Sequence, residues 1–162
     1  MNPGIRNNYW VIVLSFAVAM LLDILPLPAF LLPYWPEWVA MTLLYWVVAL
    51  PQRVGIMTAW VVGLFVDALQ GSVLGLHALS LSVMTYFALV LYQRVRLFPR
   101  WKQSLVIAML IGIYMLLALI LKSLTVTVEK QFSYWIPMLI SGAIWTWIFI
   151  LLRDIRRQFR VN

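Results

Sequence analysis

The stretch GLFVDALQGSVLGLHAL, residues 63–79, places small residues at a four-residue spacing around one carboxylate in apolar surroundings. Read in steps of four from its first glycine, it gives Gly63, Asp67, Gly71 and Gly75. Residues four apart lie almost above one another on a helix, so the first three are predicted to form one slanting row. Gly75 extends this row only if the helix continues through residues 70–74. Because small residues let helices approach closely in lipid, the row indicates either packing within the chain or an interface for a partner's transmembrane helix.

The rest of the sequence has the composition of a membrane protein. Of its 162 residues, 65% are hydrophobic and only 10% are charged, whereas a soluble domain carries about 25% charged residues. A water-soluble fold of this length would expose large apolar patches, which soluble monomers avoid. The length fits one domain. We therefore expect a single polytopic membrane domain over residues 1–162.

Six apolar runs are long enough, or nearly so, to cross a bilayer core of about 30 Å at about 1.5 Å per residue. They occupy residues 9–25, 34–50, 55–70, 76–92, 104–121 and 135–152. The runs lack the strict alternation of membrane barrel strands, and helices satisfy their own backbone in lipid. The prediction is an all-α integral membrane protein, a compact bundle of six transmembrane helices. The first run lacks a small-x-small cleavage site, so we expect an uncleaved helix.

Basic residues are distributed very unevenly between the two sides of these six spans. An even number of spans puts both termini on one side, and ten basic residues fall there: Arg6, Arg53, Arg94, Arg96, Arg100, Lys102, Arg153, Arg156, Arg157 and Arg160. The other side receives Lys122 and Lys130. Cytoplasmic loops of membrane proteins carry an excess of lysine and arginine. Both termini are therefore expected in the cytoplasm, and the net charge of +7 implies no nucleic-acid partner.

Two groups of these residues are predicted to form cytoplasmic basic patches. The first contains Arg94, Arg96, Arg100 and Lys102. The second lies in the basic tail, residues 153–162, and contains Arg153, Arg156, Arg157 and Arg160. Each such residue adds about 1 kcal/mol of attraction to anionic lipid. Contact with lipid headgroups and docking of a cytoplasmic partner both fit this pattern.

Asp67 is the residue of the glycine row whose placement in a membrane costs free energy. It lies about 18 Å along the helix from Gly55, in the outer half of its span. A carboxylate at the centre of a membrane helix costs roughly 2.5–3.5 kcal/mol on insertion scales, so Asp67 needs hydrogen-bond donors or a proton. Nearby donors are Ser72, Ser80, His77 and backbone N–H groups near Gly71. Asp67 is interpreted as a brace for the turn at residues 71–75, as a ligand or ion site, or as a contact with a partner.

A second acid, Asp23, is expected near the outer end of the first helix. With Asp67 and His77 it defines a candidate outer cavity, although a position at the membrane interface also suits Asp23, because Pro26 follows it closely. The chain has no cysteine and one histidine, which excludes disulfides, cysteine-ligated zinc and multi-histidine metal sites. Neither a nucleophile motif nor a phosphate-binding loop occurs. We therefore expect no catalytic, metal or cofactor residues and no enzymatic activity.

Three stretches resemble the rod shape-determining protein MreD family: GLFVDALQGSVLGLHALSLSVMTY (63–86), LLYWVVALPQRVG (43–55) and WTWIFILLRDIRRQF (145–159). The resemblance implies a component of the cell-elongation machinery in the bacterial inner membrane. It also implies three partners: an MreC-like bitopic membrane protein, the elongation glycosyltransferase/transpeptidase complex, and an MreB-type filament, contacted directly or indirectly. The implied fold is similar to the substrate-binding subunits of vitamin-uptake transporters. The family implies no catalytic activity.

A membrane scaffold is therefore the first functional hypothesis. The alternative is a small-molecule-binding transport subunit, which needs several convergent polar groups in its cavity. The sequence offers few beyond Asp23, Asp67 and His77. An intramembrane enzyme comes third, because no nucleophile–base pair is evident.

Overall fold

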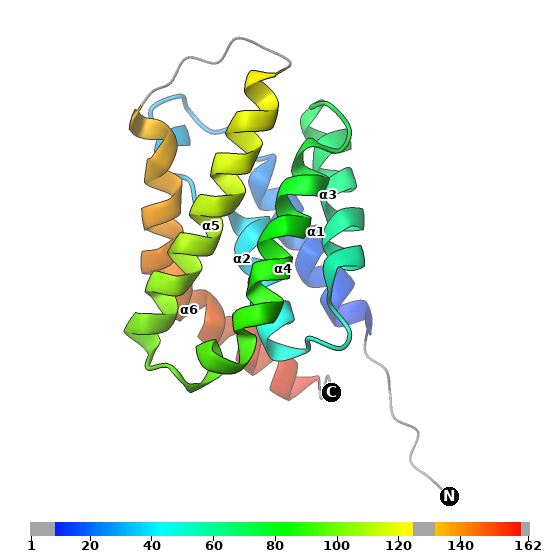
Figure 1. Ribbon diagram of the computed structural model, residues 1–162, viewed down its shortest axis with the longest axis vertical. Helices are drawn as coiled ribbons and strands as arrows, with labels where there is room; N and C mark the ends of the chain where they lie inside the picture. The colour runs from blue at the N-terminus through cyan, green and yellow to red at the C-terminus, as the bar shows by residue number, and fades with distance from the viewer. Residues whose placement is uncertain (1–8, 125–131, 160–162) are drawn as a thin grey trace, which may run out of the picture.

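The computed structural model describes residues 9–124 and 132–159, which fold into six α-helices and two short 3-10 helices (Figure 1). The α-helices are α1 (Tyr9–Asp23), α2 (Trp38–Ala49), α3 (Ile56–Gln70), α4 (Leu76–Leu97), α5 (Arg100–Ser123) and α6 (Ile136–Gln158). The 3-10 helices η1 (Leu32–Tyr34) and η2 (Phe132–Trp135) precede α2 and α6. The prediction of an all-α fold is confirmed for these residues.

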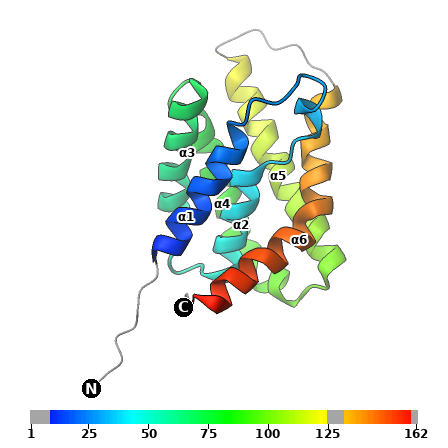
Figure 2. The ribbon, with the colours of Figure 1, turned by 180° about the vertical axis from the view of Figure 1, so that it is seen from behind.

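Helix α2 forms the centre of the bundle. Its ten residues from Val39 to Val48 are all buried, and it contacts α1, α4, α5 and α6. Trp46 is completely buried, and its indole N–H donates a hydrogen bond to Ser15 Oγ of α1 at 2.8 Å. In Figure 2, which shows the molecule from behind, α1 lies on the near side of α2. Because other helices surround α2, its hydrophobic core position, rather than exposure to lipid, explains its continuous apolar sequence.

Within residues 9–124 and 132–159, three helical segments are long and apolar enough to cross a membrane: Leu76–Leu97, Arg100–Ser123 and Ser133–Gln158. Helices α1 and α3 are apolar but have 15 residues each, a length of about 22 Å. Helix α2 starts at Trp38 rather than at residue 34, because Pro36 interrupts the helical hydrogen bonding and Trp35 Nε1 holds the preceding segment to Leu22 O at 3.0 Å.

Three helices extend beyond their predicted ends. Helix α5 spans Arg100–Ser123 instead of residues 104–121. Helix α4 continues to Leu97 instead of residue 92, and α6 continues to Gln158 instead of residue 152. Their last turns carry Arg94, Arg96, Arg156 and Arg157, whose charges favour the negative end of a helix dipole. The predicted basic loop and tail are therefore largely helical. Arg6, Lys130 and Arg160 lie outside the described residues.

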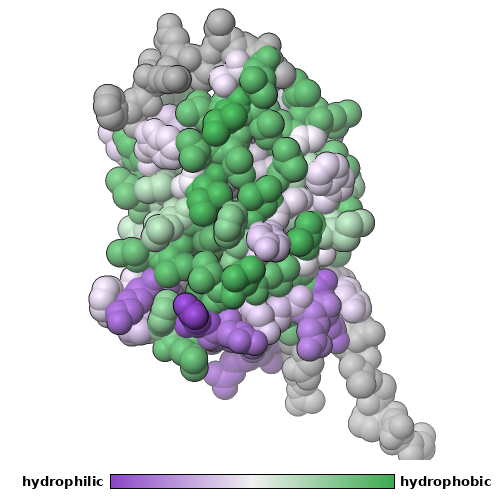
Figure 3. Space-filling model, viewed as in Figure 1, coloured by the Kyte–Doolittle hydropathy of each residue, from purple (hydrophilic) through white to green (hydrophobic). Residues whose placement is uncertain are grey.

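The molecule has one basic end. The turn between α2 and α3, the turn between α4 and α5 and the end of α6 all lie there (Figures 1 and 2). Figure 3 shows hydrophilic residues gathered in a band at this end, below a wide hydrophobic surface. The opposite end holds the α3–α4 turn and the end of α5 with Lys122. This separation of charge is the pattern expected for a chain oriented in a membrane.

Helices α3 and α4 pack with their backbones in contact at Gly63. A Cβ atom added at Gly63 would overlap Ala78 and lie 2.8 Å from the carbonyl carbon of His77. These neighbours are backbone atoms that cannot rotate away. The first glycine of the row therefore serves packing within the chain, between α3 and α4.

We predict that Gly63→Ala lowers the free energy of unfolding by about 1–3 kcal/mol, because the added methyl group overpacks a backbone contact. Thermal unfolding of the purified protein in mild detergent measures this change. The matched control is Gly112→Ala in α5, where the new methyl group meets only the end of the flexible Met138 side chain. Equal melting temperatures for the two variants would contradict the close packing of α3 on α4.

Candidate functional site

The turn between α3 and α4 reverses the chain through two glycines in the left-handed region. Gly71 has φ +63° and Gly75 has φ +101°, conformations that glycine adopts without the steric cost of a Cβ atom. The backbone N–H groups of Gly71 and Ser72 both donate to Asp67 O, which closes the end of α3. Because α3 ends at Gln70, Gly75 does not extend the slanting row of Gly63, Asp67 and Gly71.

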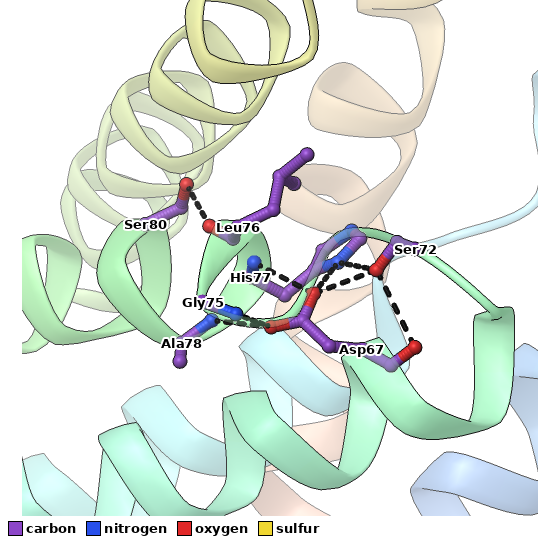
Figure 4. Close-up of polar contacts among 7 residues, drawn as sticks. All are labelled: Asp67, Ser72, Gly75, Leu76, His77, Ala78 and Ser80. Carbon is purple, nitrogen blue, oxygen red and sulfur yellow. Dashed lines mark hydrogen bonds and ion pairs between the residues drawn. The ribbon is translucent and has the colours of Figure 1, made fainter. Parts of the chain in front are cut away.

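The Asp67 carboxylate lies inside this turn and has no exposed surface. Its Oδ1 atom accepts hydrogen bonds from Ser72 Oγ at 2.7 Å and from the backbone N–H of His77 at 2.9 Å, and contacts His77 Nδ1 at 2.8 Å (Figure 4). Its Oδ2 atom accepts from the backbone N–H groups of Gly75 at 2.8 Å and Ala78 at 3.4 Å. Both oxygens are thus fully used within the chain.

These contacts join the end of α3 to the beginning of α4. The first N–H groups of a helix have no partner within that helix, and those of His77 and Ala78 find one in Asp67. The negative carboxylate also lies at the positive end of the α4 dipole. Asp67 therefore caps α4 from a neighbouring helix, which offsets the cost of burying its charge.

Three of the donors expected from the sequence are present, and one is not. Ser72, His77 and backbone N–H groups of the turn bind Asp67. Ser80 instead donates to Leu76 O at 2.8 Å, four residues earlier in α4 (Figure 4). A serine inside a helix commonly bonds back to its own backbone, and this local bond keeps Ser80 away from Asp67.

His77 is held in one orientation by its contact with Asp67. A carboxylate only accepts hydrogen bonds, so the 2.8 Å contact places a proton on Nδ1. The ring lies 6.2 Å from that of Tyr114, measured between centroids. Among residues 9–124 and 132–159, no group of three or more His, Asp or Glu side chains is placed to hold a metal ion.

A polar cavity of about 440 Å³ opens beside this turn, at the end opposite the basic end. We call it the polar cavity, and His77, Glu37, Tyr114, Tyr134, Lys122 and Met115 are part of its wall. Of the three residues predicted to line an outer cavity, it contains His77 alone. Asp67 lies behind it without exposed surface, and the Asp23 carboxylate lies beside the backbone N–H groups of Trp38 and Val39 at the start of α2.

Glu37 is a cavity residue that the sequence analysis did not identify. It precedes α2, and its backbone N–H donates to Ser141 Oγ of α6 at 2.9 Å. The available signal was an acid between Pro36 and Trp38 in an otherwise uncharged segment. Its distance in sequence from His77 and Tyr114 concealed the shared cavity, because these residues meet only through the packing of α2, α4 and α5.

The predicted basic patches come together at the basic end. Arg96 donates from Nε to Val48 O and from Nη2 to Ala49 O, both at 2.7 Å, and so caps the end of α2. The Arg100 guanidinium carbon lies 4.3 Å from the centre of the Phe149 ring of α6. Arg153 and Arg156 of α6 share a second cavity with Arg96 of α4. One residue of the first patch and two of the second therefore lie together, although they are far apart in sequence.

Comparison with known proteins gives one consistent result. A family model described as rod shape-determining protein MreD matches residues 5–155. The chain is 34% identical over 157 residues to "Rod shape-determining protein MreD" of Haemophilus influenzae, covering 94% of this chain and 95% of that protein. No solved structure matches the chain.

We predict that Asp67→Asn lowers the free energy of unfolding by about 1–3 kcal/mol. The amide nitrogen of asparagine is a donor and cannot accept a hydrogen bond. In one orientation of the amide it would face the donors of Ser72 and His77, and in the other it would face those of Gly75 and Ala78. Thermal unfolding in detergent measures the loss. Asp154→Asn, at an exposed acid of α6, removes the same charge and should leave the melting temperature unchanged. An unaltered melting temperature for Asp67→Asn would refute the capping role.

Proposed function

The chain belongs to the rod shape-determining protein MreD family, and we propose that it is a non-enzymatic membrane scaffold of the bacterial cell-elongation machinery. Its role in rod-shape determination follows from the family. In the proposed role it holds an MreC-like bitopic protein and links the elongation glycosyltransferase/transpeptidase complex to the MreB-type filament. The observation that carries the proposal is the family match over residues 5–155.

The geometry around Asp67 supports a structural role for the polar site at the α3–α4 turn. A carboxylate beside an imidazole is an arrangement that enzymes use to orient a base. Here both carboxylate oxygens are also bound by Ser72 and by backbone N–H groups. Because these bonds fix the α3–α4 turn, the pair is explained by folding alone, and no catalytic residue is proposed.

We propose that all six α-helices cross the bacterial inner membrane as one polytopic domain over residues 1–162, with the basic end in the cytoplasm. Helices α4, α5 and α6 have the required length. Short helices such as α1 and α3 are accommodated by local thinning of the bilayer and by flanking residues that reach the interface. The proposed likeness to substrate-binding subunits of vitamin-uptake transporters is supported by the compact six-helix bundle and by the polar cavity.

Helix α1 is the proposed contact for the single-span partner. It packs mainly against α2, and an apolar groove lies on each side of it. The groove against α3 has a volume of about 400 Å³ and includes Val13 and Phe65, while the groove against α6 includes Leu14 and Leu151. In lipid, helices associate where side chains of one fill hollows in another. Helix α1 presents two such hollows.

Site-specific photocrosslinking in cells tests this contact. A photoreactive residue at Val13 of α1 should crosslink to the MreC-like partner several-fold more than one at Met109 of α5. The two positions form a matched pair, because their side chains are 65% and 62% exposed. Stronger crosslinking from Met109 would exclude α1 as the contact. Recovery of a bound metabolite with no single-span partner would favour the transport alternative instead.

The proposed orientation predicts a specific pattern of cysteine labelling. Because the chain has no cysteine of its own, only the introduced cysteine can react. Ser123→Cys, at the end of α5, should react with a membrane-impermeant maleimide in spheroplasts. Gln93→Cys, near the end of α4, should react only after the membrane is opened. Both positions are exposed. The reverse pattern would show that the basic end lies outside the cytoplasm.

A further inference from the structure

A cavity of about 400 Å³ lies at the basic end, between the end of α2, the α4–α5 region and α6. We call it the basic cavity. Its polar lining residues are Arg96, Arg153, Arg156, Tyr45 and Gln103, and Phe149 with Leu50 and Val48 supplies apolar wall. No acidic residue among those that the structure describes belongs to this lining. The cavity therefore combines a strongly positive potential with an apolar side.

Contacts within the protein use only some of the hydrogen-bond donors of the arginines in the basic cavity. Arg96 uses Nε and Nη2 on the two carbonyl oxygens at the end of α2. Arg153 contacts Asp154 at 3.3 Å, a pair exposed to solvent and so weak. Arg156 forms no hydrogen bond or ion pair with any described residue. Arg153 and Arg156 thus remain able to bind an anion, to which guanidinium groups donate several hydrogen bonds at once.

Tyr45 gives a second, independent indication of a ligand. Its side chain is 1% exposed, and its hydroxyl group has no hydrogen-bond partner within the described part of the chain. Buried polar groups in folded proteins nearly always have a partner. A hydroxyl at the wall of a cationic cavity is satisfied when an anionic oxygen enters, because it donates a charge-assisted hydrogen bond.

Gln103 narrows the chemistry of that ligand. Its Nε2 donates to Val95 O at 2.9 Å and to Phe98 O at 3.1 Å, which fixes the side chain. Its Oε1 is buried and has no partner among the described residues. An acceptor is thus available beside the donors Tyr45 and Arg156. A ligand that carries a hydroxyl group next to an anionic oxygen satisfies both.

We propose that the basic cavity binds the headgroup of an anionic phospholipid that carries hydroxyl groups, such as phosphatidylglycerol. The phosphate lies against Arg153, Arg156 and the Tyr45 hydroxyl, and a headgroup hydroxyl donates to Gln103 Oε1. The lipid tails extend from the apolar side of the cavity into the bilayer. Basic pockets between transmembrane helices at a membrane surface bind anionic headgroups in this way. The proposal is independent of the scaffold function, because it requires no partner protein.

Binding of phosphatidylglycerol to the purified protein in detergent, measured by native mass spectrometry, tests the site. The double substitution Arg153→Gln with Arg156→Gln should weaken binding at least about tenfold, since it removes the charge-assisted hydrogen bonds between the guanidinium groups and the phosphate. The matched control, Arg94→Gln with Arg157→Gln, removes the same charge at the same end from exposed residues outside the cavity. It should weaken binding less than fivefold. Equal losses in the two double variants would overturn the site in favour of diffuse attraction.

Tyr45→Phe separates ligand binding from folding. It keeps the buried ring and removes only the hydroxyl group. We expect phosphatidylglycerol to bind several-fold more weakly, while the melting temperature without lipid stays the same or rises. Unchanged lipid binding would show that the hydroxyl group does not contact the ligand.

Two further ligands test the source of the phosphate. Inorganic phosphate should raise the melting temperature far less than phosphatidylglycerol, and phosphatidylcholine should bind weakly because its net charge is zero. If inorganic phosphate alone matches the stabilisation by phosphatidylglycerol, the cavity is a soluble-anion site and the lipid proposal fails. If phosphatidylcholine binds as tightly, the arginines contribute nothing and the proposal also fails.

Discussion

The bundle depends on one buried carboxylate. Asp67 has no exposed surface, and it binds Ser72, Gly75, His77 and Ala78. A charge in this position is costly unless every lone pair has a donor. The donors are present only because α3 and α4 meet at a tight turn with their backbones in contact at Gly63. The buried carboxylate therefore depends on hydrogen-bond donors that only the folded α3–α4 turn supplies. The packing of α3 on α4 depends in turn on the hydrogen bonds that the carboxylate accepts.

The two ends of the molecule use polar groups differently. At the end with the α3–α4 turn, Asp67 is satisfied inside the protein, and the adjacent polar cavity combines Glu37, His77 and two tyrosines. At the basic end, Arg96 caps α2, while Arg156 and the Tyr45 hydroxyl have no partner among the described residues. The first arrangement stabilises the bundle, and the second is suited to an anionic ligand. Both fit a member of a shape-determining family whose proposed work is to hold other components in the membrane.

The sequence predicted helices well and their ends less well. Apolar runs located all six α-helices, but an apolar criterion stops where basic residues begin, so it ended α4 and α6 too early and began α5 too late. Ser72 and His77 were predictable partners of Asp67, because they follow it within one short turn. Glu37, Tyr45 and Gln103 were not, because their cavities form from segments far apart in sequence. Gly75 illustrates the same limit: its four-residue spacing suggested a helix row, whereas its backbone conformation serves the turn.

The central claim is that Asp67 holds the start of α4, and hydrogen–deuterium exchange tests it most directly. The N–H groups of Gly75 and His77 precede the regular helical hydrogen bonds of α4, so they have no helical partner that would protect them. In the native protein reconstituted into lipid nanodiscs, both amides are predicted to exchange as slowly as amides in the middle of α4. Exchange of these two amides within seconds, while the middle of α4 stays protected, would contradict the account.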